Sequence, residues 1–215
     1  IAQMKNLFDL DLSNNAIEEL PLFLFELTEM TDFDISHNQL KTIPKEIAQF
    51  EQLFVIYAHH NYLESLPPDF FSLPALEFYL HPNQLSEIPD EIAQIGTEVM
   101  DFSYNLLEYV PESIGKMRVD HLNLSHNELT EIPDFFEFED LRILDLSKND
   151  FTEFPVQVCK VTSIRNLFLG KNDIKVIPDE IGNMQSLIVL DLWYNPIDDL
   201  PEALTNLRNL RSLDL

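Results

Sequence analysis

Apolar and polar residues alternate in short stretches along the whole chain. In "LDLSNN" at residues 10–15, Leu10 and Leu12 alternate with polar residues. A period of two is typical of a β-strand with one buried face and one face toward water. The stretch returns almost unchanged as "LDLSKN" at residues 144–149. The pattern therefore predicts a series of similar short strands.

An asparagine marks each copy of this stretch and recurs every 22 or 23 residues. A proline follows six residues after each asparagine. The nine asparagines are Asn15, Asn38, Asn61, Asn83, Asn105, Asn127, Asn149, Asn172 and Asn195. A fixed period of this length is typical of a solenoid, whose units bury their apolar sides only against their neighbours. We predict that residues 1–215 form one elongated solenoid with nine strands, one for each asparagine.

The asparagines are expected to form a structural ladder. A side-chain amide both donates and accepts hydrogen bonds, so it can satisfy buried backbone groups where the chain turns inward after a strand.

The segments that follow the prolines carry a helix-start signal. "PKEIAQF" (44–50) and "PDEIGNM" (178–184) place acidic residues directly after the proline. Proline costs no hydrogen bond at the first helical position, and acidic side chains favour the positive end of a helix. Short helical or irregular segments are therefore expected opposite the strands. In "PPDFFSLPAL" (67–76), Pro74 interrupts the pattern, and we expect an irregular coil there.

The full pattern, L-x-x-L-x-L-x-x-N-x-L-x-x-I-P-x-x-I-x-x-L, resembles the leucine-rich repeat (LRR) family in its 22–23 residue form with an IP or LP step. The resemblance covers nearly the whole chain. It implies an α/β solenoid: a curved horseshoe with a parallel sheet on its concave side and short helical or irregular segments on its convex side. Both ends fall in mid-repeat, since "LRSLDL" (210–215) stops before its asparagine, so we expect a fragment of a longer chain.

Charge is the most unusual feature of the composition. The chain has 38 acidic against 13 Lys and Arg residues, a net charge of -25. Nucleic acids are disfavoured as partners because phosphates require a basic surface. A protein partner with basic patches is favoured instead. The alternative is that the acidic residues only keep a long solenoid soluble.

The sequence also bears on location. No run of apolar residues is long enough to span a membrane. The single cysteine, Cys159, argues against a secreted protein built on disulfides. We therefore expect a cytoplasmic location.

Candidate binding residues lie at four positions per repeat, which are six, four, two and one residues before each asparagine. These positions are predicted to face the concave side. They carry all six histidines, a group of aspartates and two groups of aromatic residues. The predicted partner-binding residues are Asp9, Asp11, Asp32, Asp34, Tyr57, His59, Tyr79, His81, Tyr104, Phe168, Trp193 and Tyr194. Exposed aromatic clusters are common at the centres of interfaces. The alternative is that these aromatic residues only cover their neighbours.

Catalytic and metal chemistry are disfavoured. Ser36, His59 and Asp34 supply a hydroxyl, an imidazole and a carboxylate in neighbouring predicted positions. An open sheet, however, offers no oxyanion hole and does not exclude water. His59, His60 and His81 are a possible zinc set, but histidines on a sheet more often form a polar surface. The sequence has no phosphate-loop motif. We expect no catalytic site, no metal, no cofactor and no enzymatic activity.

The resemblance extends to function. The IP-step repeats are similar to those of intracellular signalling members of the family, namely Ras-binding scaffolds, Ras-suppressor-type proteins and the repeats of fungal adenylate cyclases. This resemblance implies a protein-interaction scaffold in signal transduction, with a small GTPase or another signalling protein as partner. One alternative is the regulatory arm of a larger enzyme of the PPM phosphatase or adenylate cyclase type. Another is a secreted or surface adhesion protein.

Overall fold

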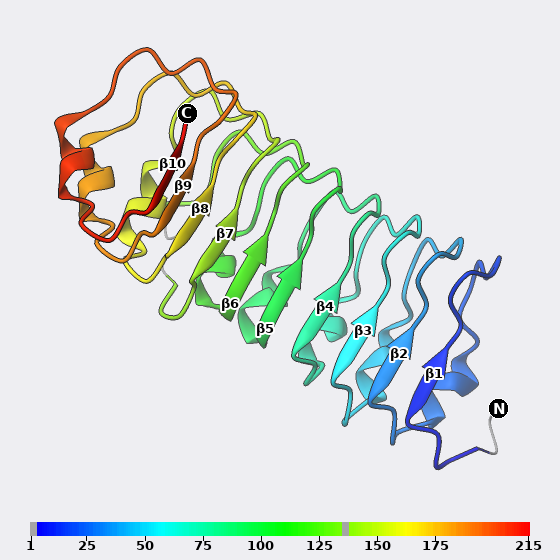
Figure 1. The fold of residues 1–215 in the computed structure, drawn as a ribbon. Coiled ribbons are helices and arrows are strands. Elements are labelled where there is room, and N and C mark those ends of the chain that lie inside the picture. Colours follow the sequence, from blue (N-terminus) through cyan, green and yellow to red (C-terminus); the bar gives the residue numbers. More distant parts are fainter. Residues whose placement is uncertain (1–3, 135–137) are drawn as a thin grey trace.

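A computed structural model describes residues 4–134 and 138–215, in which ten strands form one open parallel sheet (Figure 1). Strand order in the sheet follows chain order. The strands are β1 (Asp9–Asp11), β2 (Asp32–Asp34), β3 (Val55–Tyr57), β4 (Glu77–Tyr79), β5 (Gly96–Asp101), β6 (Arg118–Asn123), β7 (Ile143–Asp145), β8 (Asn166–Phe168), β9 (Val189–Asp191) and β10 (Ser212–Asp214). The prediction of nine strands was wrong by one, because β10 forms as a tenth strand of the sheet.

The register of the sheet brings equivalent residues of successive repeats side by side. Asp11 pairs with Asp34, Asp34 with Tyr57, and Tyr57 with Tyr79. Neighbouring strands in a sheet lie about 4.8 Å apart. Each position of the repeat therefore forms a row across the concave side, and a row can be read directly from the aligned sequence.

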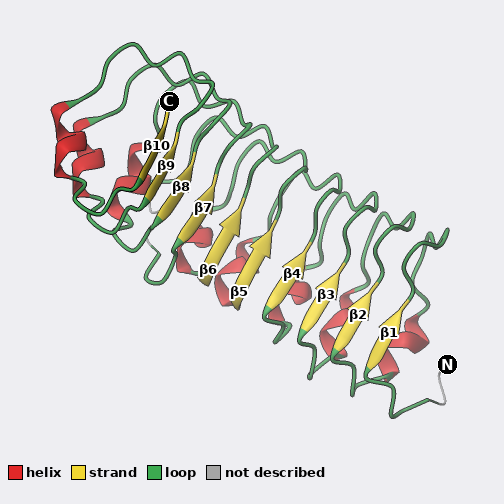
Figure 2. Cartoon of the chain, in the orientation of Figure 1, coloured by secondary structure: helices red, strands yellow, loops and turns green. Residues whose placement is uncertain are grey.

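Short 3₁₀-helices cover the opposite side of the sheet, coloured red in Figure 2. In the described part of the chain they are η1 (Leu22–Glu26), η2 (Lys45–Gln49), η3 (Pro68–Ser72), η4 (Asp90–Gln94), η5 (Glu112–Lys116), η6 (Val156–Lys160), η7 (Asp179–Asn183) and η8 (Glu202–Asn206). The segment after Pro133 passes through residues outside the described ranges. Short helical segments on the convex side are thus confirmed. None of these described helices has the length and apolar character that a membrane crossing needs.

Two details of these helices differ from the prediction. The repeated proline precedes each helix instead of occupying its first position. Its carbonyl accepts the first helical hydrogen bond, as Pro21 does from the backbone N–H of Leu24 at 3.0 Å. The irregular coil expected in residues 67–76 was also wrong, because η3 forms there. The helix ends at Ser72, and the next residue, Leu73, has the extended backbone that a following proline favours.

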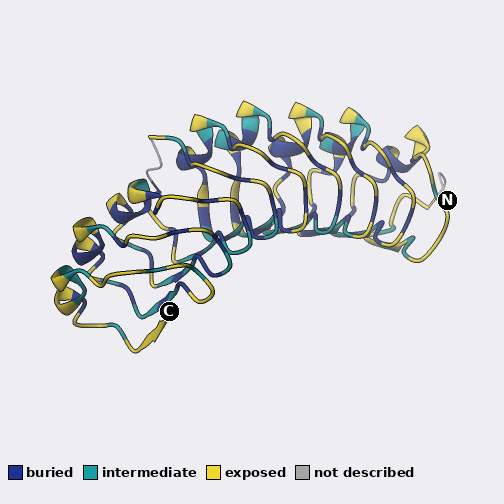
Figure 3. Cartoon of the chain, turned by 90° about the horizontal axis from the view of Figure 1, so that it is seen from above, coloured by how far each residue is buried: buried dark blue, intermediate teal, exposed yellow. Residues whose placement is uncertain are grey.

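The core lies between the sheet and the helices, and Figure 3 shows the stack as an arc with the helices on its outer side. Buried side chains of successive repeats contact one another. Phe33 of β2, for example, packs edge-on against Phe50 at a centroid distance of 5.3 Å. Each repeat therefore completes the apolar layer of the next, as expected of a solenoid.

Seven of the nine asparagines are buried beside this core: Asn38, Asn61, Asn83, Asn105, Asn127, Asn149 and Asn172. Asn127 shows the pattern. Its Oδ1 accepts the backbone N–H of Leu107 at 3.1 Å, and its Nδ2 donates to the carbonyl of Phe102 at 3.0 Å. Both partners belong to the preceding repeats. The asparagines therefore join neighbouring turns of the solenoid through their buried backbone groups.

Candidate functional site

The four positions predicted to face the concave side differ from one another in secondary structure and in exposure. Only the positions six and four residues before the asparagine lie in the three-residue strands. Several residues predicted to point outward are in fact buried by their neighbours, among them Ser36, Val55, Ser103 and Ser125.

The position directly before the asparagine lies in a turn with a positive φ, between 50° and 59°. We call these residues the turn column: Asn14, His37, His60, Tyr104, His126, Lys148, Lys171 and Tyr194. The fourth repeat has Pro82 at this place, whose ring fixes a negative φ.

The aspartates four residues before the asparagine have a structural role. The Oδ1 atoms of Asp11 and Asp34 accept the backbone N–H two residues later, at 2.7 Å from Ser13 and 2.8 Å from Ser36. Hydrogen bonds from Ser13 lower the pKa of Asp11. This local motif stabilises the turn after the strand. Of the predicted acidic group, Asp11 and Asp34 thus each have one oxygen already engaged.

The other two predicted acids, Asp9 and Asp32, lie side by side in β1 and β2. Asp32 Oδ2 accepts a hydrogen bond from the hydroxyl of Thr31 at 2.7 Å. The structure therefore brings all four predicted aspartates together on two adjacent strands.

Tyr57, Tyr79, His59 and His81 form one cluster, which we call the first aromatic patch. The two tyrosine rings stack at a centroid distance of 5.1 Å with an interplanar angle of 7°. The hydroxyl of Tyr79 donates to Glu77 Oε2 at 2.9 Å. Burial, followed by the hydrogen bond to Glu77, raises the pKa of Tyr79 to about 12. The pair is thus a stacked, neutral aromatic surface.

The two histidine rings of the patch are nearly parallel to each other and lie edge-on to the tyrosines. The rings of His59 and His81 are 6.0 Å apart, and His81 Nδ1 lies 3.1 Å from Asp101 Oδ2, although not aligned as a hydrogen bond requires. His59 Nδ1 is buried without a hydrogen-bond partner among the described residues. Burial lowers the pKa of His59. The neighbouring histidines also lower this pKa, whereas the carboxylate of Asp34 raises it by a smaller amount than burial lowers it.

The turn column adds two ring stacks that we did not predict. His37 stacks on His60 at 4.1 Å, and Tyr104 stacks on His126 at 3.6 Å. The predicted residue Tyr104 thus contacts a histidine of the next repeat. The sequence contained the signal for both stacks, because in each case the two residues occupy the same place in successive described turns.

Phe168, Trp193 and Tyr194 form what we call the second aromatic patch. Phe168 lies in β8 and pairs in register with Asp191 of β9. Trp193 and Tyr194 follow β9, with their rings 5.8 Å apart. Both are well exposed, at 39% for Trp193 and 75% for Tyr194. These exposed rings are thus not required to fill the core.

The geometry offers little for catalysis or metal binding. Within residues 4–134 and 138–215, no serine hydroxyl is hydrogen-bonded to a histidine, and Asp34 instead accepts the backbone N–H of Ser36. The described residues also contain no group of three or more His, Cys, Asp or Glu side chains placed to hold a metal ion.

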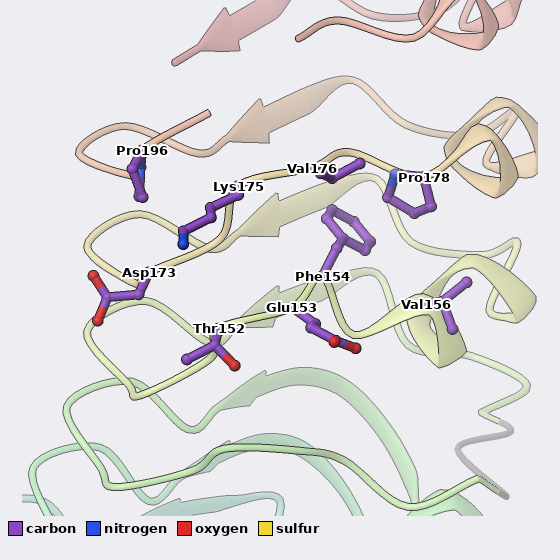
Figure 4. Close-up of a pocket in the computed structure, with 9 residues that line it drawn as sticks. All are labelled: Thr152, Glu153, Phe154, Val156, Asp173, Lys175, Val176, Pro178 and Pro196. Carbon is purple, nitrogen blue, oxygen red and sulfur yellow. The ribbon is translucent and has the colours of Figure 1, made fainter. Parts of the chain in front are cut away.

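A groove of about 830 Å³ lies on the flank of the solenoid, in the loops that follow the asparagines (Figure 4). Its lining combines apolar residues such as Phe154 and Val176 with the charged side chains of Glu153, Asp173 and Lys175. No residue of the two aromatic patches lines this groove, and the sequence did not predict it.

Comparisons with known proteins agree with this geometry. A family model described as "Leucine-rich repeat region" matches residues 118–215, and one described as "Leucine rich repeat" matches residues 5–63. In a sequence comparison, no curated protein matches the chain.

Solved structures match over the whole chain. An LRR protein of Leptospira interrogans is 29% identical with a TM-score of 0.92, and the match covers 100% of this chain and 56% of that protein. The plant peptide hormone receptor RGFR1, solved in complex with RGF2, is 26% identical with a TM-score of 0.82, covering 100% of this chain and 37% of the receptor. An internalin of Listeria monocytogenes, 20% identical with a TM-score of 0.78 over 100% of this chain and 62% of that one, shares the fold. The chain thus spans only part of the length of these relatives.

Proposed function

The chain belongs to the leucine-rich repeat family, and we propose that it binds a protein partner on its concave face. The first aromatic patch carries this proposal. Tyr57 and Tyr79 form a stacked, half-buried pair on the sheet surface, outside the apolar core. Tyrosines lose little conformational entropy on binding and are enriched among the residues that dominate interface energies.

The acidic strands beside this patch indicate the chemistry of the partner. Asp9 and Asp32 lie next to one another on β1 and β2, and β3 and β4 carry the tyrosines. A partner with basic side chains next to apolar ones is complementary to this arrangement. Tyrosine faces also attract arginine and lysine cations. We therefore favour a basic surface on the partner.

Intracellular signalling is the setting that we favour. The IP-step repeats resemble those of Ras-binding and Ras-suppressor-type proteins, so a small GTPase or another signalling protein in the cytoplasm is the leading class of partner. In this proposal the chain is a binding module and not a catalytic unit.

The second candidate is a surface-exposed recognition protein. The solved relatives favour it, since they include a bacterial internalin and a plant peptide hormone receptor bound to RGF2. Locating the protein in cells by immunofluorescence with and without permeabilisation distinguishes the two settings. Staining of intact cells would reject the cytoplasmic one.

Site-specific photocrosslinking tests the binding face directly. A photoreactive phenylalanine analogue replaces Tyr57 or Tyr79 on the concave side. In matched controls it replaces Tyr62 or Tyr109, which are exposed at 48% and 52% on the flank. We expect adducts with one protein from the two concave positions and not from the flank. Adducts only from Tyr62 and Tyr109 would reject the concave face as the binding surface.

A further inference from the structure

Lysine is nearly absent from the concave face, and its two occurrences there are adjacent. Among the four outward positions of the nine repeats, the only Lys or Arg residues are Lys148 and Lys171, although the chain has 13 such residues. Both lie in the turn column, in successive repeats. The backbone N–H of Lys148 donates to the carbonyl of Gly170, and that of Lys171 to the carbonyl of Trp193. Two cations are thus concentrated at the end of the sheet that carries the second aromatic patch.

The described residues do not neutralise these two cations through ion pairs, although carboxylates are near. Asp145 and Asp191 lie in β7 and β9, and each uses its Oδ1 to accept a backbone N–H two residues later. The ammonium of Lys171 instead lies over the aromatic rings, 4.8 Å from the centroid of Trp193 and 5.9 Å from that of Tyr194. A cation in this position remains available to an incoming anion.

Gly170 makes room for the indole. A Cβ atom at this position would overlap Trp193 Cδ1, and it would lie 2.6 Å from Trp193 Nε1 and 3.0 Å from Asp191 Oδ1. The eight other repeats carry a residue with a side chain at this place. Gly170 therefore leaves room for the indole of the next repeat to lie against the turn, beside the ammonium of Lys171.

We propose that Lys148, Lys171 and Trp193 bind an acidic side chain of the partner that is flanked by an aliphatic one. The lysines supply the positive charge for the carboxylate, and the indole supplies an apolar surface for its neighbour. Gly170 is a positioning residue that acts through Trp193. The inference rests on the proposed function and adds to it the orientation of the partner along the concave face. The partner's acidic segment docks at β7–β9, and its basic segment docks at β1–β4.

Intrinsic fluorescence tests this site because Trp193 is the only tryptophan of the chain. The chain is titrated with acetyl-Leu-Glu-Leu-amide and, as a matched neutral probe, with acetyl-Leu-Gln-Leu-amide. We expect a saturable change in Trp193 emission, with binding about two- to fivefold tighter for the Glu peptide, the range that a solvent-exposed ion pair provides. The variant Lys148→Gln/Lys171→Gln is expected to bind both peptides equally. The control Lys45→Gln/Lys116→Gln, which changes two exposed lysines of η2 and η5, is expected to keep the preference.

Gly170→Ala provides the second test. It is expected to shift the emission of Trp193 before any peptide is added and to weaken binding of the Glu peptide. Identical titrations with the two peptides, or the same preference in Lys148→Gln/Lys171→Gln, would overturn the proposal. So would unchanged emission and affinity in Gly170→Ala. The titration needs no partner protein, so it can fail while crosslinking at Tyr57 succeeds, and the reverse is equally possible.

Discussion

At the scale of single residues, the chain uses polar side chains to satisfy the backbone at each turn of the solenoid. The ladder could be predicted from the sequence because each asparagine from Asn38 onward bonds backbone groups of the preceding repeat, at the same places in the repeat pattern. The role of the repeated aspartate could not, because its contact with the backbone two residues later depends on the turn geometry. The placement of Trp193 against Gly170 was also missed, since it depends on the space between two repeats.

Replacing a buried ladder residue should therefore destabilise the fold. In Asn127→Leu, the buried N–H of Leu107 loses its partner, whereas the carbonyl of Phe102 keeps its hydrogen bond from Asn105 Nδ2. Each unsatisfied buried group costs about 1–3 kcal/mol, so the free energy of unfolding measured by urea denaturation should fall accordingly. Asn15→Leu is the control, because Asn15 is exposed and its Nδ2 contacts only its own turn, at Leu12 and Ser13. An equal loss in both variants would contradict the ladder interpretation.

At the scale of elements, the strands follow from hydrophobic alternation, whereas the details of the return segments do not. Residues 67–76 were predicted to be irregular because Pro74 breaks a helix, yet η3 is short enough to end before it. The concave rows follow from the register, so the clustering of Tyr57 with Tyr79 was predictable. The assignment of these rows as partner-binding residues stays a prediction.

The histidines of these rows should make the stability depend on pH. Burial lowers the pKa values of His59, His60 and His126 in the folded chain. As the pH falls, these histidines are therefore protonated in the unfolded chain before they are protonated in the folded chain. Their contribution to the stability of the fold is present above the unfolded pKa and is lost as the pH falls below it. We expect the drop in melting temperature between about pH 7.5 and about pH 5.5 to be smaller in His59→Gln/His60→Gln/His126→Gln than in the parent chain. The same drop in both would show that these histidines do not contribute.

At the scale of the whole molecule, the concave face has two ends of different character. Four aspartates and the first aromatic patch lie on β1–β4, whereas the only two concave lysines lie beside the second aromatic patch, near β7–β9, where Asp145 and Asp191 are the acidic strand residues. The net charge of -25 could be read from the composition, and the positions of the two concave lysines could be read from the aligned repeats. Such a face favours an elongated partner in one orientation.

The affinity of the partner identified by crosslinking tests the central claim most directly. It is measured by calorimetry with the parent chain, with Tyr57→Ala/Tyr79→Ala and with the flank control Tyr62→Ala/Tyr109→Ala, after thermal melting has shown that all three are folded. The account predicts a loss of about 2 kcal/mol or more, roughly thirtyfold in Kd, for the concave variant and nearly unchanged binding for the control. Equal affinities of the parent chain and the concave variant would contradict binding through the concave face.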